Sequence, residues 1–246
     1  MVILRAIILF CGLILLWQLI VTLFQLPVYI LPSPFLVFKT WIQQAPLILS
    51  QTYITVIETL LGLFFGVLIG AFGALMMIFF NVVRFWMLPL LIISQAIPTF
   101  AIAPLLVVWL GYGMASKIVT TMIMIFFPVT ATFFDGLRRT PQEWLDLAST
   151  MNANRWNKIW HIQVPAAMPA FASGLRVATA IAPIGAIIGE WVGSSRGLGF
   201  LMLNANARLQ IDMMFAALFT LIIFSLLLYF SVDKLLKHFI FWQVER

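Results

Sequence analysis

Residues 193–197 are the first place in this sequence to look for catalytic chemistry. They read G-S-S-R-G, which matches the G-x-S-x-G pattern of a nucleophile elbow. A serine nucleophile needs a general base within hydrogen-bond reach, and the two histidines of the sequence are His161 and His238. The topology derived below places both histidines across a membrane from Ser194 and Ser195. We therefore do not expect a hydrolase.

Nucleotide and metal chemistry lack their usual sequence patterns as well. No G-x-x-x-x-G-K-[ST] sequence is present, so the chain has no P-loop with which to bind ATP. Its one cysteine, Cys11, excludes a disulfide framework and a cysteine-based metal site. We predict a protein that is not an enzyme, holds no metal, and relies on a partner for any ATP-driven function.

Two acidic residues, Glu58 and Glu190, fall inside apolar runs. A charged carboxylate at the centre of a bilayer is unfavourable by roughly 2.5 to 3.5 kcal/mol, so we expect both at an interface or in a wet cavity. For Glu58, placement at the interface and a role in substrate binding both stay open. Glu190 precedes a glycine-containing segment that can fold back toward a pathway. The residues that we predict along a translocation pathway are Gln95, Pro98, Glu190, Gly197 and Gly199.

The composition shows which elements must position these residues. The chain is 63% hydrophobic and 9% charged, with a mean hydropathy of +1.10, which is not the composition of a soluble domain. Six apolar runs are each close to the length that a bilayer requires. They fall at 6–24, 53–80, 85–110, 117–134, 170–192 and 213–233. We predict an all-α membrane protein with six transmembrane helices in one domain, residues 1–246.

The basic residues predict the orientation of these spans. They lie scattered at the ends of apolar runs and not on one face, which argues against a nucleic-acid partner. With the N-terminus in the cytoplasm, the basic residues inside are Arg5, Arg84, Arg138, Arg139, Arg155, Lys158, Lys234, Lys237 and Arg246. Those outside are Lys39, Lys117, Arg196 and Arg208. Because positive charge favours the cytoplasmic side, both termini are predicted to be cytoplasmic.

Small residues and prolines suggest how the spans pack. Gly62, Gly66 and Gly70 recur every four positions, which makes a stripe that another helix can approach closely. Prolines inside spans free backbone carbonyls, and such helices either flank a pathway or are kinked for packing. Between the first two spans, residues 36–45 form either a short interfacial helix or an ordinary loop.

The segment 136–169 is the longest polar stretch, and the topology makes it cytoplasmic. Thr140 as N-cap, Pro141 at the first helical position and Glu143 two positions later predict the start of a helix. That helix carries an apolar face, formed by Trp144, Leu147, Ala148 and Met151.

A second helix is predicted to follow after a tight turn. Asn152 is suited to the left-handed conformation just past a helix end. Asn154 can cap the second helix, and Pro165 is expected to stop it. Apolar faces exposed outside the bilayer predict a docking site for a soluble partner.

This segment resembles the signature of a known family. The inner-membrane permeases of binding-protein-dependent ABC importers carry E-A-A, three residues, G, nine residues, then I-x-L-P. The chain has Asp146-Leu147-Ala148, three residues, Asn152, nine residues, then Ile162-Gln163-Val164-Pro165. The spacing matches in full. The departures are Asp for Glu, Leu for the first Ala, Asn for Gly and Val for Leu.

The resemblance implies a type I ABC importer permease in a bacterial inner membrane. Its expected partners are a second copy of the chain, cytoplasmic ATPase subunits that hold ATP and Mg²⁺, and a periplasmic or lipid-anchored binding protein. The residues that it implies for ATPase coupling are Trp144, Asp146, Ala148, Asn152, Ile162 and Pro165.

The resemblance also suggests a branch of this family. "AIPTFAIAPLLVVWLGYG" (96–113) and "PAAMPAFASGLRVATA" (165–180) look most like the nitrate, sulfonate and taurine branch. "IGEWVGSSRGLGFLML" (188–203) is similar to permeases for hydroxymethylpyrimidine-type thiamin precursors. The expected cargo is a thiamin pyrimidine precursor, with sulfonate, taurine or nitrate as the alternative. A secondary transporter without an ATPase, or a structural scaffold, are the rival classes.

Overall fold

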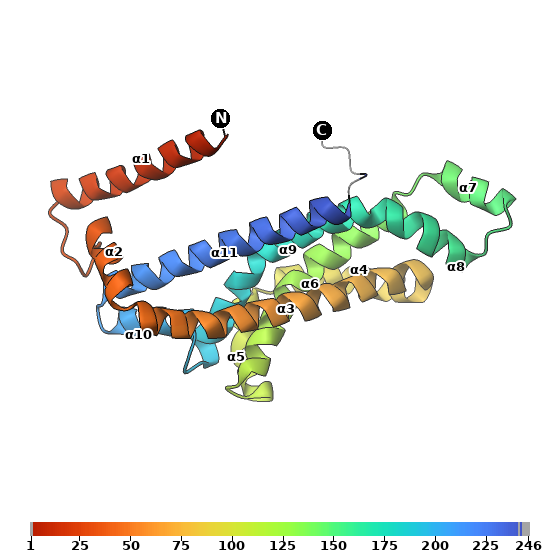
Figure 1. Ribbon diagram of the computed structural model, residues 1–246. Coiled ribbons are helices and arrows are strands. Elements are labelled where there is room, and N and C mark those ends of the chain that lie inside the picture. Colours follow the sequence, from red (N-terminus) through yellow and green to blue (C-terminus); the bar gives the residue numbers. More distant parts are fainter. Residues whose placement is uncertain (1, 241, 243–246) are drawn as a thin grey trace.

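The computed structural model describes residues 2–240 and 242, and this part of the chain is built of helices and their connections (Figure 1). Residues 1, 241 and 243–246 lie outside the described part, and with them the ends of the predicted domain and Arg246. The long helices are α1 (Val2–Leu23), α3 (Ala45–Phe79), α6 (Met114–Arg138), α9 (Val164–Gly193) and α11 (Ile211–Phe239). The shorter ones are α2 (Pro34–Gln43), α4 (Asn81–Ala96), α5 (Thr99–Leu110), α7 (Gln142–Thr150), α8 (Arg155–Lys158) and α10 (Leu198–Ala207).

The centre of the molecule is a close packing of α3, α6 and α9. The structure lays the glycine stripe of α3 against α6, and a Cβ added at Gly70 would come 2.9 Å from Val129 Cγ1. A Cβ added at Gly189 of α9 would come 2.9 Å from the Cα of Lys117, also in α6. Such contacts need glycine because any side chain would force the helices apart.

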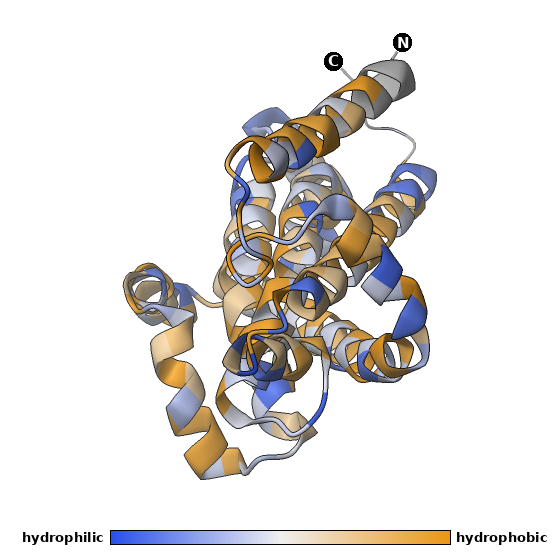
Figure 2. Cartoon of the chain, turned by 90° about the vertical axis from the view of Figure 1, so that its left-hand side faces the viewer, coloured by the Kyte–Doolittle hydropathy of each residue, from blue (hydrophilic) through white to orange (hydrophobic). Residues whose placement is uncertain are grey.

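The described residues contain four helices that are long and apolar enough to cross a membrane: α3, α6, the continuous helical segment Arg155–Gly193, and α11. A fifth span is counted if α4 and α5 are taken together. Within α1, the apolar stretch Cys11–Leu23 is shorter than a full span. Many large hydrophobic residues of the long helices are exposed, and Figure 2 shows these helices coloured mostly as hydrophobic. That surface suits contact with lipid chains.

The predicted single span at 85–110 is wrong in its shape. The helix breaks after Ala96, and α4 and α5 meet at 102°. Pro98 disfavours helical geometry at the preceding residue, and Ile97 is extended, with φ −93° and ψ 116°. Pro98 also has no N–H to donate, so the chain turns sharply at this position.

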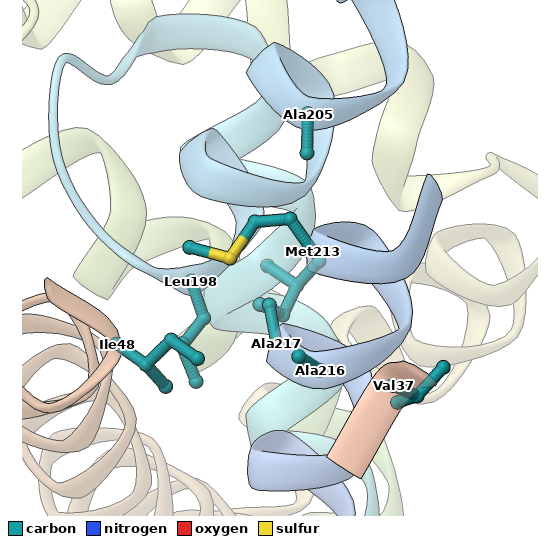
Figure 3. Close-up of a cluster of buried hydrophobic side chains, with 8 residues drawn as sticks. Val37, Ile48, Leu198, Ala205, Met213, Ala216 and Ala217 are labelled. Carbon is teal, nitrogen blue, oxygen red and sulfur yellow. The ribbon is translucent and has the colours of Figure 1, made fainter. Parts of the chain in front are cut away.

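A helix, α2, lies where one was predicted at 36–45, but it begins two residues earlier and ends at Gln43, so the alternative of an ordinary loop is wrong. Its position at the membrane interface stays a prediction. Ser33 caps it by accepting a hydrogen bond from the N–H of Leu36 at 3.3 Å, and Pro34 begins it. Trp41 Nε1 donates to Thr220 Oγ1 at 2.8 Å, which fixes α2 to α11. The buried hydrophobic cluster at this end draws its side chains from α2, α3, α9, α10 and α11, most of which Figure 3 labels.

Candidate functional site

A helical elbow projects from one end of the molecule (Figure 1). It consists of residues 142–163: α7, a tight turn, α8 and a π-helical turn (Ile159–Gln163) that runs into α9. The C-terminal end of α11 lies at the same end of the bundle, while α2 and α10 lie at the other (Figure 1).

The turn of the elbow closes with a full set of backbone hydrogen bonds. Asn152 has a φ of 56°, the left-handed conformation that its position in the sequence suggested. The N–H of Ala153 donates to the carbonyl of Ala148 at 2.9 Å, and the N–H of Asn152 donates to Ser149 at 3.0 Å. This pair of bonds is a Schellman motif. Asn154 then caps α8 through the N–H of Asn157 at 2.8 Å.

The predicted start of the first helix is wrong by one residue. The helix begins at Gln142 and its N-cap position is Pro141, not Thr140. The hydroxyl of Thr140 donates instead to the carbonyl of Leu137 at 3.1 Å. Thr140 therefore satisfies a free carbonyl at the end of α6, because a hydroxyl can bond either helix end that it reaches.

The predicted stop at Pro165 is also wrong. The helical segment continues without a break from Arg155 to Gly193. The turn before Pro165 is π-helical, and the N–H of Val164 bonds five residues back to Ile159. Pro165 lies in the first turn of α9, where a missing N–H is tolerated. The wider π turn thus lets the helix continue past Pro165.

The outer face of α7 is apolar, and no part of the chain that the structure describes covers it. Trp144, Leu147 and Met151 are 51%, 63% and 75% exposed. Ala148, the remaining member of the predicted face, is only 5% exposed and packs inward. Asp146 is exposed and accepts a hydrogen bond from Gln142 Nε2 at 2.9 Å.

Several contacts tie the elbow to the membrane helices. Arg155 Nη2 donates to the carbonyl of Ile78 in α3 at 3.0 Å. The ring of Trp156 lies 5.1 Å from that of Phe79, centroid to centroid. Gln163 Nε2 donates to the carbonyl of Leu137 in α6 at 3.2 Å. The sequence analysis missed Arg155 and Gln163 as bracing residues, since their partners lie far away along the chain.

The two arms of the elbow are also joined to each other. Lys158 Nζ in α8 donates to Ser149 Oγ in α7 at 2.7 Å. Trp156 and Trp160 lie 5.7 Å apart, centroid to centroid, and Ile159 between them is buried. Ile162 is half-buried in the π turn, and Pro165 is exposed. The elbow is therefore braced on α3 and α6 and continuous with α9.

A buried polar cluster joins three of the residues predicted along the pathway. Glu190 Oε1 accepts a hydrogen bond from Thr55 Oγ1 at 2.6 Å, and Glu190 Oε2 accepts from the N–H of Gly199 at 2.5 Å. Gly197 donates its N–H to Gln51 Oε1 at 2.7 Å. Glu190 is buried inside the protein. Its two oxygens are occupied by donors of this same chain.

Glu58 and Lys117 form a buried ion pair, and their depth in the membrane stays a prediction. Lys117 Nζ lies 2.8 Å from Glu58 Oε1, and the two side chains are 6% and 0% exposed. Lys117 was counted among the outer basic residues, and it is buried within the protein, where its charge stabilises the buried Glu58 carboxylate. The pair joins α3 to α6. Glu58 Oε2 has no partner within the described chain.

Gln95 and Pro98 belong to α4 and to the start of α5, which contribute no residue to that cluster. Both are exposed, and they flank the bend between α4 and α5. Nothing in the described chain covers them. Their place on a pathway stays a prediction.

The long apolar helices define a multi-pass membrane protein, and the elbow is its exposed element at one end. The chain belongs to the family described as binding-protein-dependent transport system inner membrane component, whose family model matches residues 62–241. It is thus the permease subunit of an ABC importer, an inner-membrane protein without an ATPase site of its own.

The chain is similar to named permeases over nearly its whole length. A probable ABC transporter permease protein of Haemophilus influenzae is 55% identical over 94% of this chain and 94% of its own length. The formylaminopyrimidine transport permease protein ThiX of Halalkalibacterium halodurans is 32% identical over 96% of this chain and 95% of its own length.

A solved structure shares the fold. It is the MetNI methionine ABC transporter in inward-facing conformations, matched with a TM-score of 0.67 and 18% identity. The match covers 80% of this chain and 97% of that one. It supports the all-α permease architecture.

Proposed function

We propose that the elbow is the coupling site through which a cytoplasmic ABC ATPase drives this permease. The observation that carries the proposal is the uncovered apolar face of Trp144, Leu147 and Met151 on a helix braced against α3 and α6. An exposed apolar face of this kind gains stability when a protein partner covers it. Because the elbow is hydrogen-bonded to α3 and α6, a partner that moves the elbow would also move these membrane helices.

The mechanism that we propose is alternating access. ATP closes the ATPase dimer, the elbow moves with it, and the connected helices switch the pathway between inward and outward openings. Coupling requires one element whose equilibrium is biased from both sites. The elbow meets this requirement because it is continuous with α9 and bonded to α3 and α6.

The proposed assembly has two copies of this chain, two ATPase subunits with their ATP and Mg²⁺, and a binding protein on the outer side. In the proposed topology α1 and the bent α4–α5 pair complete six crossings, and both termini are cytoplasmic. The grouping of the elbow with the end of α11 agrees with that topology (Figure 1).

The test compares two substitutions at one exposed position. Leu147→Asp places a charge in the apolar face, whereas Leu147→Met keeps an apolar side chain of similar size. Leu147→Asp should reduce co-purification of the ATPase at least tenfold, about the effect of losing 1.4 kcal/mol of binding energy. Leu147→Met should leave co-purification unchanged. Equal co-purification by both variants would refute the coupling site.

For the cargo we propose a small pyrimidine of the thiamin-precursor type. The support is the whole-length similarity to a permease named for formylaminopyrimidine transport. The measurement is ATP hydrolysis by the reconstituted complex with its binding protein, in the presence of hydroxymethylpyrimidine, formylaminopyrimidine, taurine or nitrate. Stimulation by a pyrimidine is the expected result, and stimulation by taurine or nitrate alone would assign the alternative cargo.

A further inference from the structure

The first turn of α10 is held by side chains of two other helices. The N–H groups of Gly197, Leu198 and Gly199 are consecutive. They donate in turn to Gln51 Oε1 at 2.7 Å, Thr55 Oγ1 at 2.8 Å and Glu190 Oε2 at 2.5 Å. The acceptors come from α3 and α9. Free N–H groups at the start of a helix normally bond to a nearby cap or to water, so three tertiary partners make an unusually strong attachment.

The attachment requires a glycine at position 197. Gly197 has a φ of 109°, which side chains rarely permit, and a Cβ there would overlap the carboxylate of Glu190. Thr55 takes part twice, since its hydroxyl donates to Glu190 and accepts from Leu198. We call Gln51, Thr55 and Glu190, with the turn that they bind, the latch.

The latch lies among buried residues. Thr55, Glu190 and Leu198 are all almost fully buried. Leu198 also packs against Ile48 of α3 in the cluster of Figure 3. Close to Thr55 on the same helix, Glu58 pairs with Lys117 and so joins α3 to α6.

Opening the latch would be strongly unfavourable. It would leave a buried carboxylate and three backbone donors without partners, and buried polar groups are destabilising when unpaired. An arrangement with these properties suits a fixed joint better than a contact that breaks in every transport cycle.

We propose that the latch stays closed throughout the transport cycle and makes the α9–α10 turn a fixed wall of the permease, with Glu190 as a positioning residue and not a substrate ligand. The joined ends of α3, α9 and α10 then keep their positions relative to one another and move as one body when the elbow shifts. This inference does not depend on the identity of the cargo or on which residues touch the ATPase.

The test measures whether Leu198 ever becomes accessible. In the complex with its ATPase and with Cys11→Ser as background, Leu198→Cys is treated with N-ethylmaleimide without nucleotide and again with ATP and vanadate. Ser195→Cys is the matched control, because Ser195 is exposed in the same turn. Leu198→Cys should react at least about tenfold more slowly than Ser195→Cys in both states, since burial protects a thiol. Rapid reaction in either state would overturn the proposal.

A second set of variants tests whether the hydroxyl of Thr55 is responsible for the protection of Leu198→Cys. Thr55→Val removes the hydroxyl at nearly constant volume, Thr55→Ser keeps it, and Thr59→Val is the control. Thr59 is buried on the same helix, but its hydroxyl bonds the backbone of α3 itself. Only Thr55→Val should raise the reactivity of Leu198→Cys, by about tenfold, and Thr55→Ser should restore protection. Equal reactivity of the two valine variants would contradict the latch.

Discussion

Single residues inside the bundle show what the sequence could and could not reveal. Glu58 and Glu190 stand out in apolar runs, so both were identifiable as special. Their partners were not, because Lys117 and Thr55 come from helices whose relative register depends on packing. Glycine spacing did indicate a packing stripe on α3, and the structure lays that stripe against α6.

The Glu58–Lys117 pair leads to a prediction about stability. Lys117→Met should lower the free energy of unfolding by about 3 to 5 kcal/mol, because it leaves the buried Glu58 carboxylate unpaired. Adding Glu58→Leu should recover most of that loss, since an apolar pair of similar size replaces the ions. Thermal unfolding of the detergent-purified chain measures both. A double variant no more stable than Lys117→Met alone would argue against the pair.

Among the elements, hydrophobic length predicted the long helices and little about their breaks. The apolar runs located α3, α6, α9 and α11, since twenty apolar residues have few other stable arrangements in a membrane. Pro98 was recognisable as a helix breaker, but a 102° bend and a mild kink look alike in sequence. Pro165 suggested the end of a helix, yet the helix continues past it because the preceding turn is π-helical.

The turn of the elbow allows a prediction at the scale of an element. Asn152 has a positive φ, so Asn152→Gly should preserve the turn, whereas the β-branched Asn152→Val should strain it. We expect ATP-driven uptake by the reconstituted complex to fall at least tenfold with Val and by less than about twofold with Gly. Similar uptake by both variants would show that the shape of this turn is unimportant for transport.

At the scale of the whole molecule, the two ends of the bundle have different properties. One end presents an uncovered apolar face on a braced elbow, and the other holds α10 through buried hydrogen bonds. We infer that motion of the ATPase is transmitted to the permease at the elbow. At the opposite end, the latch keeps the α9–α10 turn attached to α3. The spaced signature predicted the location of the elbow. The bracing contacts depend on tertiary structure and could not be read from the sequence.

The central claim is that the outer face of α7 contacts a nucleotide-hydrolysing partner. The most direct measurement places a photo-activated cross-linking amino acid at Trp144, with Ser195 in the α9–α10 turn as the control at the far end of α9. The account predicts a cross-linked product with a P-loop ATPase from Trp144 and none from Ser195. The absence of that product at Trp144, or equal amounts from both positions, would contradict the account.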